Sequence, residues 1–425
     1  MKKQAMPENA QEQFRQYLPE VVQTTLKQVG EAADAVGIDV YLVGGAVRDM
    51  LMRRKVLDID IVVEGSSMDF VQKMDLPGGG RPVRHRAFDT VKLRLNGLDM
   101  DVASARKESY ARPGALPLVA PGSIIDDLSR RDFTINSMAI CLNKYHFGEL
   151  LDPFGGKNDL RAKLIRLLHD RSFMDDSTRI FRAIRYEQRL GFNIEQESML
   201  LLKRDVHMID TISGDRIRNE IYLMLGEKLP EKPVLRAQKL SVFRQIHPAL
   251  TSSTWLTSSY PKARKVLTKE DLQPVYLTLL LYGLDAEELQ ELHMRLNFPR
   301  AELDLVSKTL QLKRQLKQLG RAGLKPFQIY TLLKGYPPRA VQANVMVTSS
   351  PLIRARLYRY LRRWIDVKPL LKGDELVSTG ITRGPQIKKY LDLLLEAYLN
   401  GEISTRAEAK KLLQYLMKRP RVSGR

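Results

Sequence analysis

The hydrophobic pattern divides the chain into a mixed front section and a helical remainder. Up to about residue 145, short apolar runs and alternating segments predict strands at 39–43, 59–63, 91–95 and 100–103, with a turn at Asn96-Gly97 between the last two. A helix is expected at 46–53, between the first two strands. After Asp170, apolar residues recur every three or four positions. The pattern therefore predicts an α+β head followed by a long helical body.

The connection at residues 110–122 breaks this pattern. It contains three prolines and two glycines and follows neither a strand nor a helix period. We therefore expect a loop there, long enough to be functional or mobile.

Charge and composition narrow the class of protein. The chain has 69 Lys and Arg residues against 49 Asp and Glu, a net charge of +20, which favours a polyanionic partner such as nucleic acid. A single cysteine and six histidines exclude a disulfide framework or a Cys/His zinc site. The start lacks an apolar signal region, and the longest apolar stretch, 275–284, is too short to span a bilayer. We expect a cytoplasmic protein without a membrane segment.

Two glycines and two aspartates are candidates for chemistry in the front section. Gly44 and Gly45 stand where the first strand turns into a helix, so backbone N–H groups there can face a phosphate. Asp58 and Asp60 are two residues apart in an apolar strand, which places both carboxylates on one face of the sheet. Like charges this close favour a bound cation, and oxygen ligands suit Mg²⁺. The plain alternative is an acidic, exposed strand face.

A third carboxylate is available on a neighbouring predicted strand. Asp99 and Asp101 repeat the same spacing, and either can complete a three-carboxylate cluster, with Asp101 as our candidate catalytic residue. Nucleotidyl transfer assisted by two metal ions typically uses a glycine turn, an aspartate pair and a third acid. In such a reaction the protein supplies mainly position and charge.

Four ordered segments between about residues 40 and 225 carry a family resemblance. They are residues 44–49 with Asp58-Ile59-Asp60, residues 130–139, residues 152–156 with Asp159, and residues 176–179 with Arg182 and Arg185. In this order they resemble the motifs of the class II tRNA nucleotidyltransferase and bacterial poly(A) polymerase family. Residues 213–220 and 380–385 are more loosely similar to later elements of the family.

The resemblance implies a fold, an activity and partners. The fold is a DNA polymerase β-like nucleotidyltransferase palm followed by an all-helical neck, body and tail, expected at residues 1–145, 146–228, 229–335 and 336–425. The activity is template-independent addition of C, C and A to the 3′ end of tRNA from CTP and ATP, with release of pyrophosphate. Two Mg²⁺ ions held by Asp58 and Asp60 are the implied cofactor. The implied partner is tRNA, and no protein partner is expected.

The resemblance assigns base selection to Asp176 and Arg179, and their chemistry explains how they replace a template. We expect both on one helix, three residues apart and so on nearly the same face. A carboxylate only accepts hydrogen bonds and a guanidinium only donates them. Cytosine and adenine present an amino donor beside a ring acceptor, whereas uracil and guanine present a carbonyl beside an N–H. UTP and GTP would therefore leave buried polar groups unpaired. Asp175 replaces the family's usual glutamate, and a surface ion pair is the plain alternative for the selecting pair.

Further nucleotide contacts are implied around this pair. The resemblance suggests that Asp132 and its neighbours read the ribose 2′-hydroxyl and that Arg131 contacts phosphate, with Asn136 on the same predicted helix. Residues 152–156 with Asp159 resemble the element on which head and neck turn. The nucleotide-binding candidates are Gly44, Gly45, Arg48, Arg131, Asp132, Asn136, Asp176, Arg179, Arg182 and Arg185.

A basic and aromatic segment near the end of the chain is a candidate RNA surface. Arginines alternate there with Tyr358, Tyr360 and Trp364, which predicts a helix with aromatic platforms for RNA. Leu352 and Leu357 belong to its expected buried stripe, so ordinary amphipathicity explains part of the pattern. The candidate RNA-binding residues are Arg354, Arg356, Arg359, Arg363 and Arg383.

Other activities share the same catalytic residues. Enzymes of this family that add only CC are described as lacking a flexible stretch between the first two motifs, whereas residues 105–129 are long and uninterrupted here. A-only addition is therefore the closest alternative, followed by poly(A) synthesis. A non-catalytic RNA-binding protein is disfavoured by the intact Asp58 and Asp60.

Overall fold

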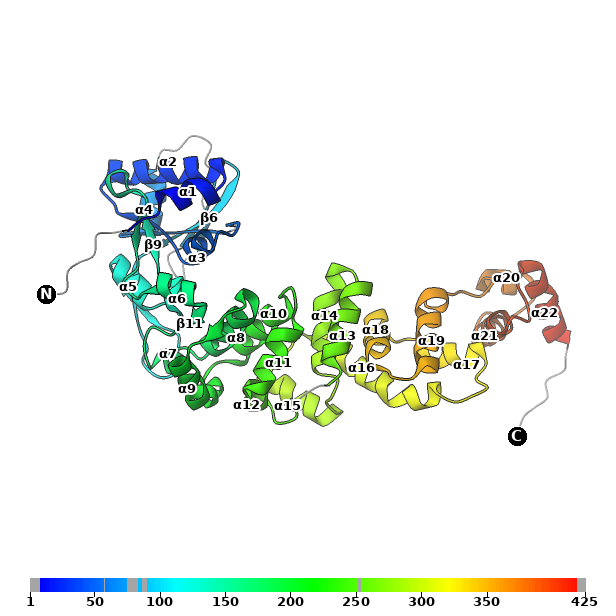
Figure 1. Cartoon of the computed structure of the whole chain (residues 1–425). Helices are drawn as coiled ribbons and strands as arrows, with labels where there is room; N and C mark the ends of the chain where they lie inside the picture. Colours follow the sequence, from blue (N-terminus) through cyan, green and yellow to red (C-terminus); the bar gives the residue numbers. More distant parts are fainter. Residues whose placement is uncertain (1–7, 57, 75–82, 86–89, 251–253, 419–425) are drawn as a thin grey trace. The chain divides into compact units, whose positions relative to one another are not determined.

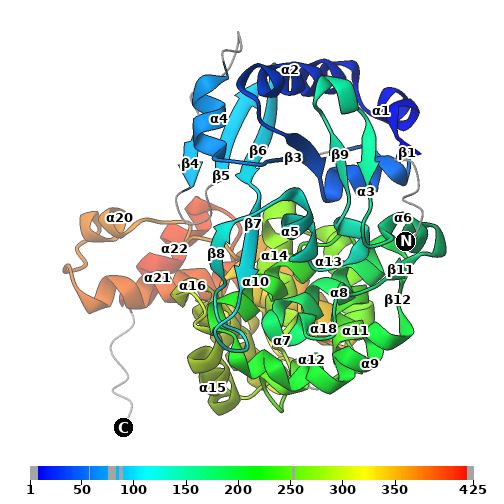
Figure 2. The same ribbon diagram turned by 90° about the vertical axis from the view of Figure 1, so that its left-hand side faces the viewer.

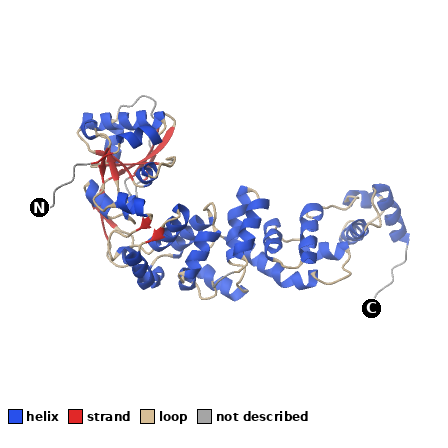
Figure 3. Cartoon of the chain, in the orientation of Figure 1, coloured by secondary structure: helices blue, strands red, loops and turns tan. Residues whose placement is uncertain are grey.

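The chain forms two compact units. The computed structural model describes residues 8–56, 58–74, 83–85, 90–250 and 254–418. Its two units are Met1–Pro248 and Ala249–Arg425. Every described strand belongs to the first unit, and the described part of the second unit is helical (Figures 1 and 3). The four-part division into head, neck, body and tail stays a prediction.

An eight-stranded sheet is the centre of the first unit. Its spatial order is β1 (Glu8–Asn9), β10 (Glu149–Leu151), β9 (Ala139–Cys141), β2 (Val40–Val43), β3 (Ile59–Val63), β6 (Leu98–Ser104), β5 (Thr90–Leu95) and β4 (Val83–His85). The β3–β6 pair is parallel, and the other pairs are antiparallel. The four strands predicted from the sequence are confirmed. Their apolar residues either alternate with polar ones or form a continuous run that is buried on both faces of the sheet. The other four strands are short and carry no such signal.

Local sequence explains the best-predicted hairpin. Val91, Leu93 and Leu95 of β5 are buried and the residues between them are exposed, as period-two alternation requires. Asn96 and Gly97 have φ values of 52° and 79°, the left-handed conformation that a two-residue hairpin turn needs at both positions. The chain therefore returns directly into β6.

Helices cover both faces of the sheet. Helices α2 (Glu20–Val36) and α4 (Ser67–Lys73) lie on one face, and α5 (Ile124–Ser129) lies on the other (Figure 2). Leu128 of α5 packs in a buried cluster with Tyr41 and Val62 of the central strands. Helix α3 (Gly45–Leu51) follows β2 as predicted.

The prediction of a long loop at 110–122 is wrong in part. Residues Arg106–Ser109 (β7) and Leu118–Pro121 (β8) pair as an antiparallel hairpin, which leaves only 110–117 as the connection. All four residues of β8 are exposed. A strand without a buried face has no hydrophobic alternation, so the sequence pattern could not reveal it.

The rest of the first unit is mainly helical, as predicted. Helix α1 (Gln11–Tyr17) lies between β1 and β2, and η3 (Lys144–His146) lies between β9 and β10. After the sheet come α6 (Gly156–Ala162), α7 (Ser172–Asp175), α8 (Thr178–Leu190), α9 (Gln196–Asp205), η4 (Val206–Thr211), α10 (Gly214–Leu225), α11 (Glu231–Lys239) and α12 (Val242–Ile246). Two short strands, β11 (Leu164–Ile165) and β12 (Asn193–Ile194), pair in parallel between them.

The second unit consists of ten helices and one π-helical turn in its described residues. The helices are α13 (Leu256–Val266), α14 (Lys269–Leu280), α15 (Ala286–Leu296), α16 (Arg300–Leu319), α17 (Pro326–Leu333), α18 (Pro338–Val347), α19 (Pro351–Arg359), α20 (Gly373–Ser378), α21 (Pro385–Asn400) and α22 (Arg406–Lys418). The π-helical turn is Tyr360–Trp364. Across the described part of the chain, none of the helices combines the length and the apolar character that a bilayer span requires.

Two of the three predicted aromatic platforms of this unit are wrong, and the role of the half-buried Tyr358 stays a prediction. Tyr360 and Trp364 are only 3% and 8% exposed and pack in a core cluster with Leu357. Leu352, expected in the buried stripe, is 45% exposed. The RNA-binding roles of the neighbouring arginines stay predictions, and Arg354 and Arg356 donate to backbone carbonyls of Thr348 and Leu319.

Candidate functional site

A cavity of about 890 Å³ in the first unit gathers most of the predicted site residues. Its wall is built by the β2–α3 turn, the start of β3, the β7–β8 hairpin, the segment after α5, and helices α8 and α10. Arg185 and Asp101 are not part of the wall. The predicted residues that line it are Gly44, Gly45, Arg48, Asp58, Asp60, Arg131, Asp132, Asn136, Asp176, Arg179 and Arg182.

The glycine turn allows close approach of an arginine to the backbone. Gly44 has a φ of 66°, a conformation that favours glycine, and precedes α3. A Cβ added to Gly44 would lie 2.7 Å from Nη1 of Arg131. The guanidinium of Arg131 therefore occupies the space that a side chain would fill.

The carboxylate pair lies beside this arginine. In the parallel β3–β6 register, Asp60 is opposite Asp101, whereas Asp99 faces Arg94 at the turn and its side chain is 85% exposed. Burial raises the pKa of Asp60, and the nearby Asp101 and Asp58 add to this effect against the opposing charge of Arg131. A carboxylate that is destabilised by burial and by like charges gains from a bound cation.

The donor set fits a hard divalent cation. Asp58 and Asp60 offer carboxylate oxygens, the ligands that Mg²⁺ prefers. Within residues 8–418, gaps excepted, no three His, Cys, Asp or Glu side chains are grouped closely enough to hold a metal ion. The aspartate pair is thus present in the cavity wall, and the catalytic role of Asp101 stays a prediction.

A buried polar chain connects α3, next to the glycine turn, with helix α8. Arg48 donates to the Asn136 amide oxygen at 2.7 Å, and the Asn136 amide nitrogen donates to Asp132 at 2.9 Å. The other oxygen of Asp132 accepts from Arg182 at 2.7 Å. Burial opposes ionisation of Asp132, but Arg182 and Asn136 outweigh it and hold the pKa of the carboxyl below its usual range. This chain of contacts fixes the side chain of Asn136.

The prediction that one helix carries Arg131, Asp132 and Asn136 is wrong. Helix α5 ends at Ser129, and Asn136 lies on a separate 3-10 helix, η2 (Thr134–Asn136). Phe133 between them is extended, with φ −137° and ψ 151°, because it bridges Leu167 in an antiparallel fashion. Tertiary pairing of Phe133 overrides the helical pattern.

The predicted base-selecting pair is close together but not on one helix. Asp176 is extended, with φ −141° and ψ 100°, and its carboxylate accepts from the backbone N–H of Thr178 at the start of α8. Arg179 lies in the first turn of α8 and is 6% exposed. No ion pair joins the two side chains among the described contacts, which removes the plain alternative of a surface ion pair.

Both members of this pair have partners that sequence reasoning missed. Arg216 of α10 donates to Asp176 at 2.7 Å. Arg179 donates to the Ser172 hydroxyl and to the backbone carbonyl of Arg130, each at 2.6 Å. The similarity of residues 213–220 to a family motif pointed to the region of Arg216, but not to this contact.

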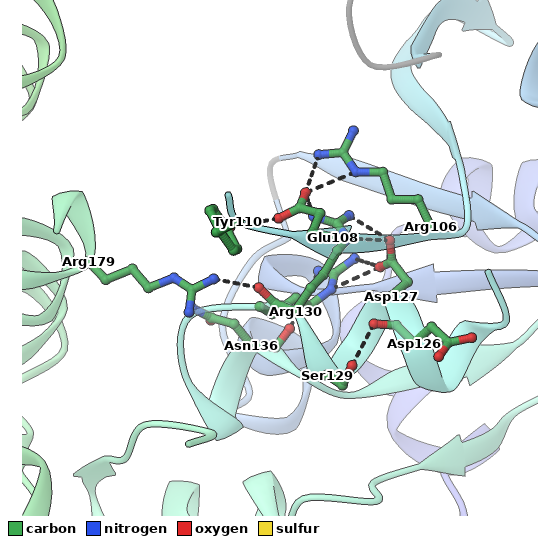
Figure 4. A network of polar contacts seen from close by, with 10 residues as sticks. Arg106, Glu108, Tyr110, Asp126, Asp127, Ser129, Arg130, Asn136 and Arg179 are labelled. Carbon is green, nitrogen blue, oxygen red and sulfur yellow. Dashed lines mark hydrogen bonds and ion pairs between the residues drawn. The ribbon is translucent and has the colours of Figure 1, made fainter. Parts of the chain in front are cut away.

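A second network, also missed, supports Arg179 from the hairpin (Figure 4). Glu108 of β7 is 6% exposed and accepts from Arg106, Arg130 and Tyr110. Arg130 also pairs with Asp127, whose other oxygen binds Arg131. The only signal in the sequence is the placement of Asp127 three and four residues before two arginines.

The remaining family-like residues make contacts within the protein. Asp152 accepts from the backbone N–H groups of Gly156 and Lys157, which caps α6. Asp159 accepts from Thr134 and Arg166. Arg185 lies outside the cavity wall and pairs with Glu227 and with Glu220, which lines the cavity. Their roles in hinge motion and nucleotide binding stay predictions.

Two family models match the chain. The model of the poly A polymerase head domain matches residues 40–166. The model described as a probable RNA and SrmB-binding site of polymerase A matches residues 191–254. These ranges include all of the cavity wall except the stretch between them.

Similar whole proteins have related names. The A-adding tRNA nucleotidyltransferase of Geobacter sulfurreducens is 36% identical over 417 residues, which cover 94% of this chain and 47% of the relative. The A-adding tRNA nucleotidyltransferase of Halalkalibacterium halodurans is 31% identical over 412 residues, which cover 90% of this chain and 90% of the relative. The chain thus spans about half the length of the first relative and most of the second.

Solved structures agree in fold. A structure titled CCA-adding enzyme apo form II has a TM-score of 0.85 at 31% identity, covering 96% of this chain and 99% of the other. The Thermotoga maritima CCA-adding enzyme complexed with tRNA has a TM-score of 0.78 at 30% identity, with 97% and 99% coverage. Together, the sheet, the cavity and these likenesses define a nucleotidyltransferase with the polymerase β-like fold. More specifically, the chain belongs to the family of tRNA nucleotidyltransferases related to poly(A) polymerases.

Proposed function

We propose that the chain adds C, C and A to the 3′ end of tRNA from CTP and ATP, without a nucleic-acid template. One observation carries the proposal: a single cavity contains both an aspartate pair suited to metal ions and a carboxylate and guanidinium suited to reading a base. The overall charge of +20 supports a nucleic-acid substrate.

The reaction joins the 3′-hydroxyl of the RNA to the α-phosphorus of the nucleotide, and pyrophosphate leaves. Two Mg²⁺ ions bound at Asp58 and Asp60 would lower the pKa of that hydroxyl and neutralise the triphosphate. The absence of a side chain at Gly44 lets the guanidinium of Arg131 lie against the turn, where its charge would meet the phosphates. Arg48 is fixed by Asn136 and Asp49, so it needs no reordering when a nucleotide binds.

Base choice in this proposal belongs to Asp176 and Arg179. Asp176 accepts from the amino group that cytosine and adenine share, and Arg179 donates to the adjacent ring nitrogen. Arg179 has two of its five N–H groups engaged by Ser172 and Arg130, so its orientation is set while other donors remain available.

A second candidate is addition of the terminal A alone. It is favoured by the names of three similar relatives, all A-adding tRNA nucleotidyltransferases at 31–36% identity. Both candidates use the same cavity residues, so the substrate's starting 3′ end separates them.

The experiment counts nucleotides added to tRNAs that end at the discriminator base or at CC. For the proposed function, CTP alone extends the first tRNA by two nucleotides, and CTP with ATP extends it by three. An A-only enzyme leaves the first tRNA unextended and adds one A to the second. Continued ladders of A would indicate poly(A) synthesis. The Asp60→Asn variant is the control for contaminating activity and is expected to retain tRNA binding without extension.

A further inference from the structure

Two cations at the rim of the cavity have no role in the mechanism above. Arg54 and Lys55 both line the cavity and are exposed. They lie in the connection between α3 and β3, four and three residues before Asp58. Their position puts two positive charges next to the predicted reaction centre.

These two side chains differ from the other basic residues of the wall, most of which are already neutralised. Seven wall arginines make ion pairs: Arg48–Asp49, Arg106–Glu108, Arg130–Asp127, Arg131–Asp127, Arg182–Asp132, Arg189–Glu227 and Arg216–Asp176. Within the described residues, no ion pair or hydrogen bond involves the side chain of Arg54 or Lys55. Apart from Arg179, they are the described cations of the wall whose charge no described carboxylate offsets.

The backbone that carries them is nevertheless well fixed. Arg53 has a φ of 58°, the left-handed conformation that usually selects glycine after a helix. Its N–H donates to the Met50 carbonyl at 2.9 Å, and the Arg54 N–H donates to the Asp49 carbonyl at 2.8 Å. This pair of bonds is the Schellman arrangement, which terminates α3 and sets the direction in which the chain leaves it.

We infer that Arg54 and Lys55 bind phosphate groups of the RNA strand whose 3′-hydroxyl enters the cavity. The inference rests on the proposed function, because it takes that RNA as a substrate. The strand must bring its hydroxyl to Asp58 and Asp60, so its last phosphates pass the rim beside them. In the proposed function, the nucleotide's own phosphates bind separately, at the glycine turn next to Arg48 and Arg131.

The test compares removal of the two rim cations with removal of their neighbour. The double variant Arg54→Ala/Lys55→Ala is expected to raise the KM for tRNA about tenfold or more, as loss of charge-assisted contacts does. The KM for ATP stays within about twofold of wild type. The slope of log affinity against log salt falls by about 1.4, at about 0.7 for each lost contact to a single strand.

Arg53→Gly is the matched control. It removes a charge from the same turn, suits the φ of 58°, and changes a residue outside the cavity wall. It is expected to leave both KM values unchanged. The exchange Arg54→Lys/Lys55→Arg keeps both charges and is expected to restore most of the tRNA affinity.

Two kinetic results would overturn the inference. One is a higher KM for ATP with an unchanged KM for tRNA, which would assign the cations to the triphosphate. The other is an Arg53→Gly variant that matches the double variant, which would make the effect one of general charge.

A binding measurement keeps this inference separate from the proposed function. If wild-type protein extends no tRNA, the proposed function fails. Binding of a single-stranded RNA oligonucleotide, measured by fluorescence anisotropy without nucleotide, then tests the rim alone. Equal affinity of wild type and double variant in that assay would refute phosphate binding by Arg54 and Lys55.

Discussion

Asp127 is the residue on which we expect the geometry of the cavity wall to depend most. Its carboxylate is fully buried on α5, where one oxygen accepts from Arg130 at 2.5 Å and the other from Arg131 at 2.8 Å. Arg131 in turn lies against Gly44, and its charge opposes the rise that burial causes in the pKa of Asp60. Replacing Asp127 should therefore affect stability and catalysis together.

The size of the effect follows from burial. Removing one partner of a buried ion pair costs about 3–5 kcal/mol. The side chains of Arg130 and Arg131 are 20% and 18% exposed, so water can partly replace the lost carboxylate contacts. We expect about 3 kcal/mol for Asp127→Ala, and about 1–2 kcal/mol for Asp127→Asn, which keeps the shape and one acceptor. For a unit of this size, each kcal/mol lowers the Tm by about 2–4 °C.

The assay measures thermal unfolding of the full chain and kcat/KM for A addition. Asp99→Ala is the control, because its pair with Arg94 is exposed on both sides and spans 3.6 Å. Such surface pairs contribute less than about 1 kcal/mol. We expect Asp127→Ala to lower kcat/KM at least about tenfold at a temperature where the variant is folded. A loss of stability no larger than that of Asp99→Ala would refute the reasoning.

Three further predictions concern other contacts. Arg216→Ala removes the partner of Asp176 and is expected to raise misincorporation of UTP and GTP, measured with each nucleotide alone, while Tm changes little. Gly30→Ala places a Cβ 1.9 Å from a backbone carbonyl oxygen, so denaturant unfolding should show a loss of at least about 1–3 kcal/mol. The lowered pKa of Asp132 beside Arg182 stabilises the fold above the unfolded pKa of about 3.9. The stability gap between wild type and Asp132→Asn should therefore shrink as pH falls below about 4.

Local patterns in the sequence predicted the parts of the fold that depend on local structure. The β5–β6 hairpin is an example, since alternation and an Asn-Gly turn specify it without reference to the rest of the chain. Alternation cannot say which strand lies next to β3. Asp60 lies opposite Asp101 because β3 and β6 pair in parallel, and this pairing joins residues about forty positions apart. For this reason the sequence left Asp99 and Asp101 as alternatives.

The error in the second unit had a visible cause. Tyr360 and Trp364 are three and seven residues after Leu357, which is the spacing of one helical face. They therefore belong to the buried stripe that contains Leu357, and the structure places them in its core cluster. Their aromatic character suggested RNA stacking, but the periodicity already favoured burial.

The contacts of the predicted base-selecting pair lay beyond any local pattern, and they change how the cavity is understood. Arg216 is forty residues from Asp176, and Arg130 is forty-nine residues from Arg179. Such pairing neutralises most of the cavity wall. Among the described residues, the wall contains ten Arg and Lys against seven Asp and Glu, an excess of three. The chain as a whole carries +20. Most of the charge available to attract a polyanion therefore lies outside the cavity, so the wall can be specialised for orientation while other surfaces supply the attraction.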